Sequence, residues 1–182
     1  MESMSLTKID RRPWLVAALL LVAVVWISIR CFWLPVQVTT VFIVRHAEKA
    51  GGGADPPLSA AGQARAQELV HVLGDEGIDA VFVTDLVRTQ QTGAPMAAAA
   101  GLAAQQYPAG DAAGVAATIL ADHAGERVLV VGHSNTVDDI AAALGASGLP
   151  DLAEDQFDRL FVVHRFSSVA HLDRLRYGAA TP

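Results

Sequence analysis

One stretch of the sequence, residues 41–48, joins an apolar run to a cation and an imidazole. Residues 41–44 are β-branched or aromatic, which is typical of a central strand of a parallel sheet that is apolar on both faces. Arg45 and His46 follow this run directly. Ligands of open α/β sheets bind beyond the carboxyl ends of the strands. These two side chains are therefore well placed to meet an anionic ligand.

Two further apolar runs, 79–84 and 127–132, are predicted strands that are also followed by polar residues. Arg88 comes shortly after the first run, at the start of a predicted helix, and His133 comes directly after the second. If the three strands are parallel, their carboxyl ends meet at one edge of the sheet. Two arginines and two histidines would then line one pocket.

Such a pocket favours phosphoryl chemistry. Guanidinium forks match phosphate oxygens bidentately, and the helix N-termini that follow the strands add N–H groups aimed at an anion. An imidazole nitrogen can attack phosphorus and form a covalent intermediate, while neighbouring cations stabilise the transferring group. One arginine or histidine at a strand end is weak support, so the prediction depends on their joint occurrence at three ends.

The elements that must position these residues follow from the apolar periodicity. Two more strands, over 160–166 and 169–177, are joined by a two-serine turn. Ser59 is a plausible N-cap, and helices are expected over 59–74, 86–100, 112–123 and 136–144. Gly93 and Pro95 leave open a kink or a restart in the second helix. The order β-α-β-α-α-β-α-β-β predicts a three-layer α/β/α domain with a mainly parallel central sheet.

The charge of the chain limits its partners. The 182 residues carry a formal net charge of −6, and from residue 38 onward 17 acidic residues stand against nine basic ones. This balance argues against general nucleic-acid binding, which needs a basic surface, so no nucleic-acid partner is expected. Cys31 is the single cysteine and excludes an intramolecular disulfide.

The N-terminal segment is strongly apolar and contains or adjoins all three tryptophans. We expect a cytoplasmic tail at 1–12, a transmembrane signal anchor at 13–34 and a domain at 35–182. Lys8, Arg11 and Arg12 precede the apolar run, so the domain is predicted on the extracytoplasmic (periplasmic) side, anchored to the membrane by the helix. A cleaved signal peptide and a buried core helix are the alternatives.

Three segments together resemble the motifs of the histidine phosphatase superfamily, which has the phosphoglycerate mutase-like fold. Residues 41–48 resemble its Arg-His-Gly signature, 84–92 its Ser-x-x-x-Arg-x-x-x-Thr segment and 128–135 its second-histidine motif. The similarity runs from about residue 38 to the C-terminus, and the form Arg-His-Ala-Glu-Lys is similar to that of exported bacterial members. Ala47 and Thr84 replace the usual Gly and Ser, and Ser134 and Asn135 stand where glycines often follow the histidine.

The resemblance implies a role for each matched residue. His46 would be the phosphate-accepting nucleophile, with one ring nitrogen held by a backbone carbonyl. Arg45 and Arg88 would clamp the phosphoryl oxygens, and His133 would complete the phosphate-binding set as a further donor. Water would then hydrolyse the phosphohistidine, and no metal or other cofactor would be required. The expected activity is metal-independent hydrolysis of a small phosphate monoester or a phosphoprotein.

The proton donor to the leaving group is the gap in this assignment. The family generally supplies a carboxylate from a variable loop, and the candidates here are Asp111, which is slightly preferred, and Glu48. Asp111 is alternatively a helix N-cap, and Glu48 is alternatively the partner of a nearby cation. If neither serves, His133 or the acidity of the leaving group must take over this step.

Three other functions are compatible with parts of the sequence. Residues 130–136 resemble a nucleophile elbow, so Ser134 with Asp158 and His171 would have the chain order of a serine hydrolase, although Thr136 stands where glycine is required. A membrane-tethered phosphate-ester binding module without turnover is a second alternative, because the acid is not assured. A mutase is the third, but the short chain leaves little room for the insertion that it would need.

Overall fold

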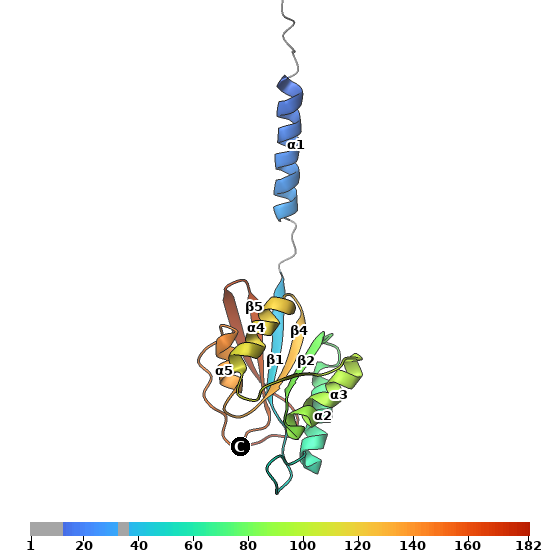
Figure 1. Ribbon diagram of the computed structural model, residues 1–182, viewed down its shortest axis with the longest axis vertical. Helices are drawn as coiled ribbons and strands as arrows, with labels where there is room; N and C mark the ends of the chain where they lie inside the picture. Colours follow the sequence, from blue (N-terminus) through green and yellow to red (C-terminus); the bar gives the residue numbers. More distant parts are fainter. Residues whose placement is uncertain (1–12, 33–36) are drawn as a thin grey trace, which may run out of the picture. The chain divides into compact units, whose positions relative to one another are not determined.

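The computed structural model describes residues 13–32 and 37–182, which are drawn in colour in Figure 1. The chain divides into two units, Met1–Val36 and Gln37–Pro182. In the first unit, α1 runs from Pro13 to Phe32. None of the described helices is both long enough and apolar enough for a membrane crossing. The predicted anchor over 13–34 is therefore not supported, and its last two residues and the predicted tail at 1–12 lie outside the described residues.

The second unit is built on a six-stranded sheet in the order β3-β2-β4-β1-β5-β6. Strands β1, β2, β3 and β4 are parallel, whereas β5 and β6 run antiparallel as a hairpin beside β1. The predicted α/β class is confirmed. The sheet is mainly parallel, as predicted, but the antiparallel hairpin makes it a mixed sheet. The strands are β1 (Val38–Arg45), β2 (Ala80–Thr84), β3 (Gln105–Tyr107), β4 (Arg127–Gly132), β5 (Arg159–Phe166) and β6 (Val169–Arg176).

Helices cover both faces of this sheet and give the domain three layers (Figure 1). The core of one face joins α4 and α5 to side chains of β1, β4 and β5, and the core of the other joins α2 and α3 to alternate residues of the same strands. Both faces are apolar because a central strand of a parallel sheet is buried on both sides. The helices are α2 (Ala60–Leu73), α3 (Val87–Ala100), α4 (Ala112–Asp122) and α5 (Val137–Ala143).

Two local features differ from the sequence-based prediction. Helix α3 continues through Pro95, so neither a kink nor a restart is needed to describe it. Gly93 is required for packing rather than for a break, because a Cβ there would lie 2.6 Å from the Cγ1 of Val83 on β2. The short strand β3 is absent from the sequence-based prediction, since three residues at a sheet edge carry almost no periodicity.

The pairing of β1 with β4 fixes the geometry of the sheet edge. Arg45 is in register with Gly132, the last residue of β4. The residues that follow these two positions, His46 and His133, therefore leave neighbouring strands at the same level. The backbone N–H of His46 extends the ladder by donating to the carbonyl of Gly132 at 2.9 Å.

Candidate active site

The two predicted histidines face each other at this edge. The rings of His46 and His133 lie 5.5 Å apart between centroids and meet at 60°. Both side chains are buried, with 3% and 7% of their surface exposed. Arg45 and Arg88 act electrostatically on both rings. The structure thus brings together the four residues that the motifs predicted to bind phosphate, and for that prediction these four are called the phosphate site below.

The imidazole of His46 is held in one tautomer. Its Nδ1 lies 2.8 Å from the carbonyl oxygen of Ala47, which can only accept, so Nδ1 carries the proton. Burial lowers the pKa of His46 to about 4, because the charged form loses its hydration and the backbone bond to Ala47 only partly offsets this. The Nε2 lone pair is therefore free for nucleophilic attack at neutral pH.

The chain after His46 is tied to the helix that carries Arg88. The N–H of Ala47 donates to the hydroxyl of Thr92 at 3.0 Å, and that hydroxyl donates to the Arg88 carbonyl at 2.7 Å. Thr92 is fully buried. These two bonds hold the segment after His46 against the first turns of α3, which gives a structural reason for the spacing of Arg88 and Thr92 in the predicted motif.

Arg45 is almost completely buried, with 1% of its surface exposed. Its guanidinium donates to the Ala153 carbonyl at 2.8 Å and to the Glu154 carboxylate at 3.1 Å, and it lies 4.3 Å above the centre of the Phe157 ring. All three partners come from the loop between α5 and β5. The Nε–H of Arg45 is buried and makes no hydrogen bond within the described residues.

Arg88 reaches the site from the first turn of α3, and its guanidinium lies 3.4 Å from a carboxylate oxygen of Asp55. Its Nε–H is also buried without a partner among the described residues. Buried donors are nearly always paired, so these two groups leave room for an anionic partner. Arg165, at the other end of the sheet, also has a buried Nε–H without a partner among the described residues, so this feature alone does not define an anion site.

His133 is oriented by hydroxyl groups. Its Nε2 lies 3.2 Å from the hydroxyl of Thr84, which in turn lies 2.8 Å from that of Thr89. Burial lowers the pKa of His133 to about 4, and the positive charges of Arg88 and Arg45 act in the same direction. An anion bound between these groups would favour the protonated form, so binding and proton uptake at His133 are coupled.

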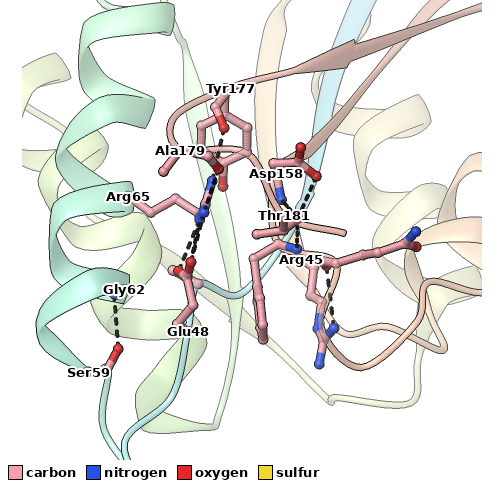
Figure 2. Close-up of polar contacts among 12 residues, drawn as sticks. Arg45, Glu48, Ser59, Gly62, Arg65, Asp158, Tyr177, Ala179 and Thr181 are labelled. Atoms are coloured by element: carbon pink, nitrogen blue, oxygen red, sulfur yellow. Dashed lines mark hydrogen bonds and ion pairs between the residues drawn. The ribbon is translucent and has the colours of Figure 1, made fainter.

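Of the two predicted proton donors, Glu48 is committed to an ion pair. Figure 2 shows its carboxylate directed at Arg65, whose Nε and Nη2 lie 3.0 and 2.7 Å from it. Burial is the largest single influence and would raise the pKa of Glu48. The hydrogen bonds from Arg65, a backbone hydrogen bond and the charges of Arg65 and Arg45 together outweigh it and hold that pKa below its usual range. A carboxyl group that stays ionised in this way is a poor proton donor.

Asp111 serves as the N-cap of α4, the alternative that the sequence left open. Its carboxylate accepts a hydrogen bond from the N–H of Gly114 at 2.9 Å. The hydrogen bond of this side chain is thus with its own helix and not with a residue of the phosphate site. Asp111 is exposed to solvent.

The serine hydrolase alternative is wrong, because the structure does not assemble its triad. The hydroxyl of Ser134 donates to Glu154 at 3.0 Å. Asp158 is buried against the Thr181 hydroxyl at 2.7 Å, and His171 lies on the edge strand β6, where its Nε2 is 3.2 Å from Asp173. Chain order alone suggested this triad, and chain order does not determine which side chains meet.

Sequence reasoning missed three residues that contact the two arginines. Glu154 and Phe157 contact Arg45, and Asp55 contacts Arg88. All three lie in segments without regular structure, so no periodicity or motif marked them.

No cluster of histidine, cysteine and acidic side chains that could hold a metal ion occurs in residues 13–32 and 37–182.

Comparison with known proteins gives one match to a family and one to a curated relative. Residues 41–109 match the histidine phosphatase superfamily (branch 1). The PE-PGRS family protein PE_PGRS11 of Mycobacterium tuberculosis (strain ATCC 25618 / H37Rv) is 37% identical over 81 residues, which cover 40% of this chain. The chain spans only about 14% of the length of that relative.

Solved structures share the fold at low sequence identity. The protein histidine phosphatase SixA, complexed with tungstate, has a TM-score of 0.63 at 23% identity, over 75% of this chain and 96% of that one. A mycobacterial glucosyl-3-phosphoglycerate phosphatase has a TM-score of 0.61 at 17% identity, over 78% and 100%. A putative alpha-ribazole-5'-P phosphatase from Escherichia coli has a TM-score of 0.61 at 19% identity, over 78% and 99%. Residues 41–109 therefore match the histidine phosphatase superfamily, and the domain shares its fold with these solved phosphatases.

Proposed function

We propose that the domain hydrolyses phosphate monoesters through a phosphohistidine on His46. The observation that carries this proposal is a buried, neutral imidazole with a fixed Nδ1–H and a free Nε2, set among Arg45, Arg88 and His133. The match of residues 41–109 to the histidine phosphatase superfamily supports phosphatase activity in general. The two buried, unpartnered Nε–H groups of the arginines support an anionic ligand.

In the first step, His46 Nε2 attacks phosphorus and the bond from phosphorus to the leaving oxygen breaks, with the electron pair departing on that oxygen. Arg45 and Arg88 stabilise the charge on the transferring group, because both are already held in place before the reaction. In the second step, water attacks phosphorus, the P–N bond breaks, and the electron pair returns to Nε2. The proton of the water leaves with the released phosphate or to solvent.

Asp111 is the proposed donor of the proton to the leaving oxygen, since Glu48 is held ionised by Arg65. To act, its carboxyl group must leave the Gly114 N–H that it now caps. Asp111→Asn should therefore slow the hydrolysis of alkyl phosphates, whose leaving groups need a proton, and spare nitrophenyl phosphate, whose leaving group departs as a stable anion. If Asp111→Asn changed the rates of both substrate classes by the same factor, the proton would have to come from another group.

The substrate is a small phosphate monoester or a phosphoprotein. The named activities of two proteins with this fold, a protein histidine phosphatase and a glucosyl-3-phosphoglycerate phosphatase, correspond to these two classes. Both transfer a phosphoryl group away from a leaving group, so the proposed chemistry at His46 is the same. The leaving group distinguishes them, and it is bound by the surroundings of the site.

The decisive experiment compares the full-length chain with His46→Ala. Nitrophenyl phosphate hydrolysis and an acid-labile phosphoenzyme should both disappear in the variant, and His71→Ala, an exposed position on α2, is the matched control that should keep both. Hydrolysis that survives in His46→Ala would refute the mechanism.

A binding module without turnover is the second candidate, favoured by one observation: both predicted donors make other contacts in the structure. It predicts that the wild-type chain binds inorganic phosphate but neither hydrolyses nitrophenyl phosphate nor becomes labelled. Titration calorimetry with phosphate, run beside the activity assay, separates this candidate from the enzyme.

A further inference from the structure

The surroundings of the phosphate site carry an excess of negative charge. Glu154 and Asp155 act electrostatically on Arg45, and Asp55 and Asp85 act on His133. Beyond the two arginines of the site itself, Lys49 is the cation that acts on Glu154. Four carboxylates therefore act electrostatically on Arg45 or His133, and one ammonium group acts on Glu154.

This balance becomes more negative when a substrate binds. A phosphate monoester is close to a dianion at neutral pH, so its phosphoryl oxygens neutralise the charges of Arg45 and Arg88. The leaving group then faces the remaining charges alone. These are the four carboxylates and Lys49, and their field is repulsive for any second anionic group of the substrate.

Glu154 is the carboxylate with the most direct access to the leaving group. It bonds to the buried Arg45 at 3.1 Å and accepts a hydrogen bond from Ser134 at 3.0 Å, yet its side chain is 77% exposed. A residue that touches a buried guanidinium and also faces solvent must lie at the mouth of the site. A phosphoryl oxygen that binds the same guanidinium therefore lies beside this carboxylate.

We infer that Glu154 is a specificity-determining residue, and that the site accepts phosphate on neutral or cationic leaving groups and rejects leaving groups that carry a second negative charge. This inference rests on the proposed function, because it names the substrate class of the same site. For one unit charge placed several ångströms from the carboxylate at an exposed rim, the discrimination should be about five- to tenfold. It should shrink in high salt, where exposed charges are screened.

The test uses three aryl phosphates that share one reaction and differ in one charge. Their phenols carry a para aminomethyl, methyl or carboxylate group, which makes the leaving group cationic, neutral or anionic. For the full-length wild-type chain, kcat/KM should be highest for the cationic substrate and about five- to tenfold lower for the anionic one than for the neutral one. Glu154→Gln should reduce these differences, and Glu154→Lys should reverse their order.

Glu76→Gln is the matched control. Glu76 is an exposed acid near Thr40 and Arg127, where β1 and β4 begin, at the opposite end of the strands from the site. Its removal changes the net charge of the chain by the same amount and should leave the substrate order unchanged. A purely structural role of Glu154 would lower kcat/KM for all three substrates equally, and that result would overturn the inference.

A second measurement keeps this test independent of turnover. Arylphosphonates with the same three substituents cannot be hydrolysed at phosphorus, and their dissociation constants should follow the same charge order and the same response to Glu154→Gln. Equal affinities for all three, together with hydrolysis that depends on His46, would overturn the inference and leave the proposed function intact. Charge-ordered binding without any hydrolysis would instead overturn the proposed function and keep the selectivity.

Discussion

Two arginine–glutamate pairs in this domain differ in the number of their contacts and in their exposure to solvent. Arg65 and Glu48 form a fork-to-carboxylate pair at 2.7 to 3.0 Å, with both side chains largely shielded from solvent. Arg45 and Glu154 share a single contact at 3.1 Å, and the glutamate is mostly exposed. The first pair is saturated, whereas the second leaves the arginine able to exchange its carboxylate for another anion.

The wider contacts of the two arginines agree with this difference. Arg65 also donates to the carbonyls of Tyr177 and Ala179, both at 2.9 Å, so it fastens the C-terminal segment to α2 (Figure 2). Arg45 keeps a buried Nε–H without a partner in the described part of the chain. Arg65 therefore stabilises the fold, whereas Arg45 keeps a donor that a bound anion could use.

The largest expected effect is on stability, at the saturated pair. Arg65→Met leaves the shielded Glu48 carboxylate without a partner and frees the C-terminal segment, so the free energy of unfolding should fall by about 3 to 5 kcal/mol. Urea unfolding followed by circular dichroism measures this. A loss below about 1 kcal/mol would show that the pair of Arg65 and Glu48 contributes little to the stability of the fold.

Between pH 7 and pH 5 the pH dependence of stability should come mainly from the phosphate site, because the lowered pKa of Glu48 affects stability only at lower pH. The pKa values of His46 and His133 are about 4 when folded, against 6.5 unfolded, so the unfolded chain binds more protons between these values. Stability is therefore lost as the pH falls below 6.5. Each histidine should cost about 2 kcal/mol between pH 7 and pH 5.

The variant His133→Asn isolates one half of this effect, since an amide can still bond to the Thr84 hydroxyl. The decrease in unfolding free energy from pH 7 to pH 5 should be smaller by about 2 kcal/mol than in the wild type. Saturating sulfate, which stays dianionic over this range, should also reduce the decrease by favouring protonated His133. Identical pH profiles in the two proteins would contradict the buried, neutral state of this histidine.

For the pair of Arg45 and Glu154, the expected effect is on the rate of hydrolysis. Arg45→Lys keeps the charge but loses the planar fork, so kcat/KM for nitrophenyl phosphate should fall by about 100-fold. The free energy of unfolding should fall by less than in Arg65→Lys, because Arg45 makes fewer side-chain hydrogen bonds than Arg65. The same change at Arg65 should show the reverse pattern, with lower stability and near-normal kcat/KM in the folded protein.

The smallest expected effect is the stability change on removing the exposed glutamate. Glu154→Gln should alter the unfolding free energy by less than about 0.5 kcal/mol, because an ion pair with one exposed partner contributes little. Glu48→Gln should cost clearly more, since it leaves Arg65 buried without its counter-charge. Similar losses in the two variants would remove the distinction between the pairs.

Much of the fold and of the site could be read from local patterns. The apolar runs predicted β1, β2 and β4 together with the hairpin, and Ser59 caps α2 through the N–H of Gly62 as expected. Arg45, His46, Arg88 and His133 follow strand ends, so parallel pairing alone brings them close. The predicted location of the domain across a membrane remains a sequence-based prediction.

The sequence by itself determined which residues stand at the strand ends, because strand and helix periodicity is encoded in neighbouring residues. Only the tertiary structure decided which carboxylate meets which arginine. Glu48 and Arg65 are separated by 17 positions, and Arg45 and Glu154 by 109. Glu48 lies beside the nucleophile in the chain but turns to α2, whereas Glu154 reaches the site from a remote loop. Such contacts depend on how loops pack across the finished sheet, and no local pattern of residues carries that information.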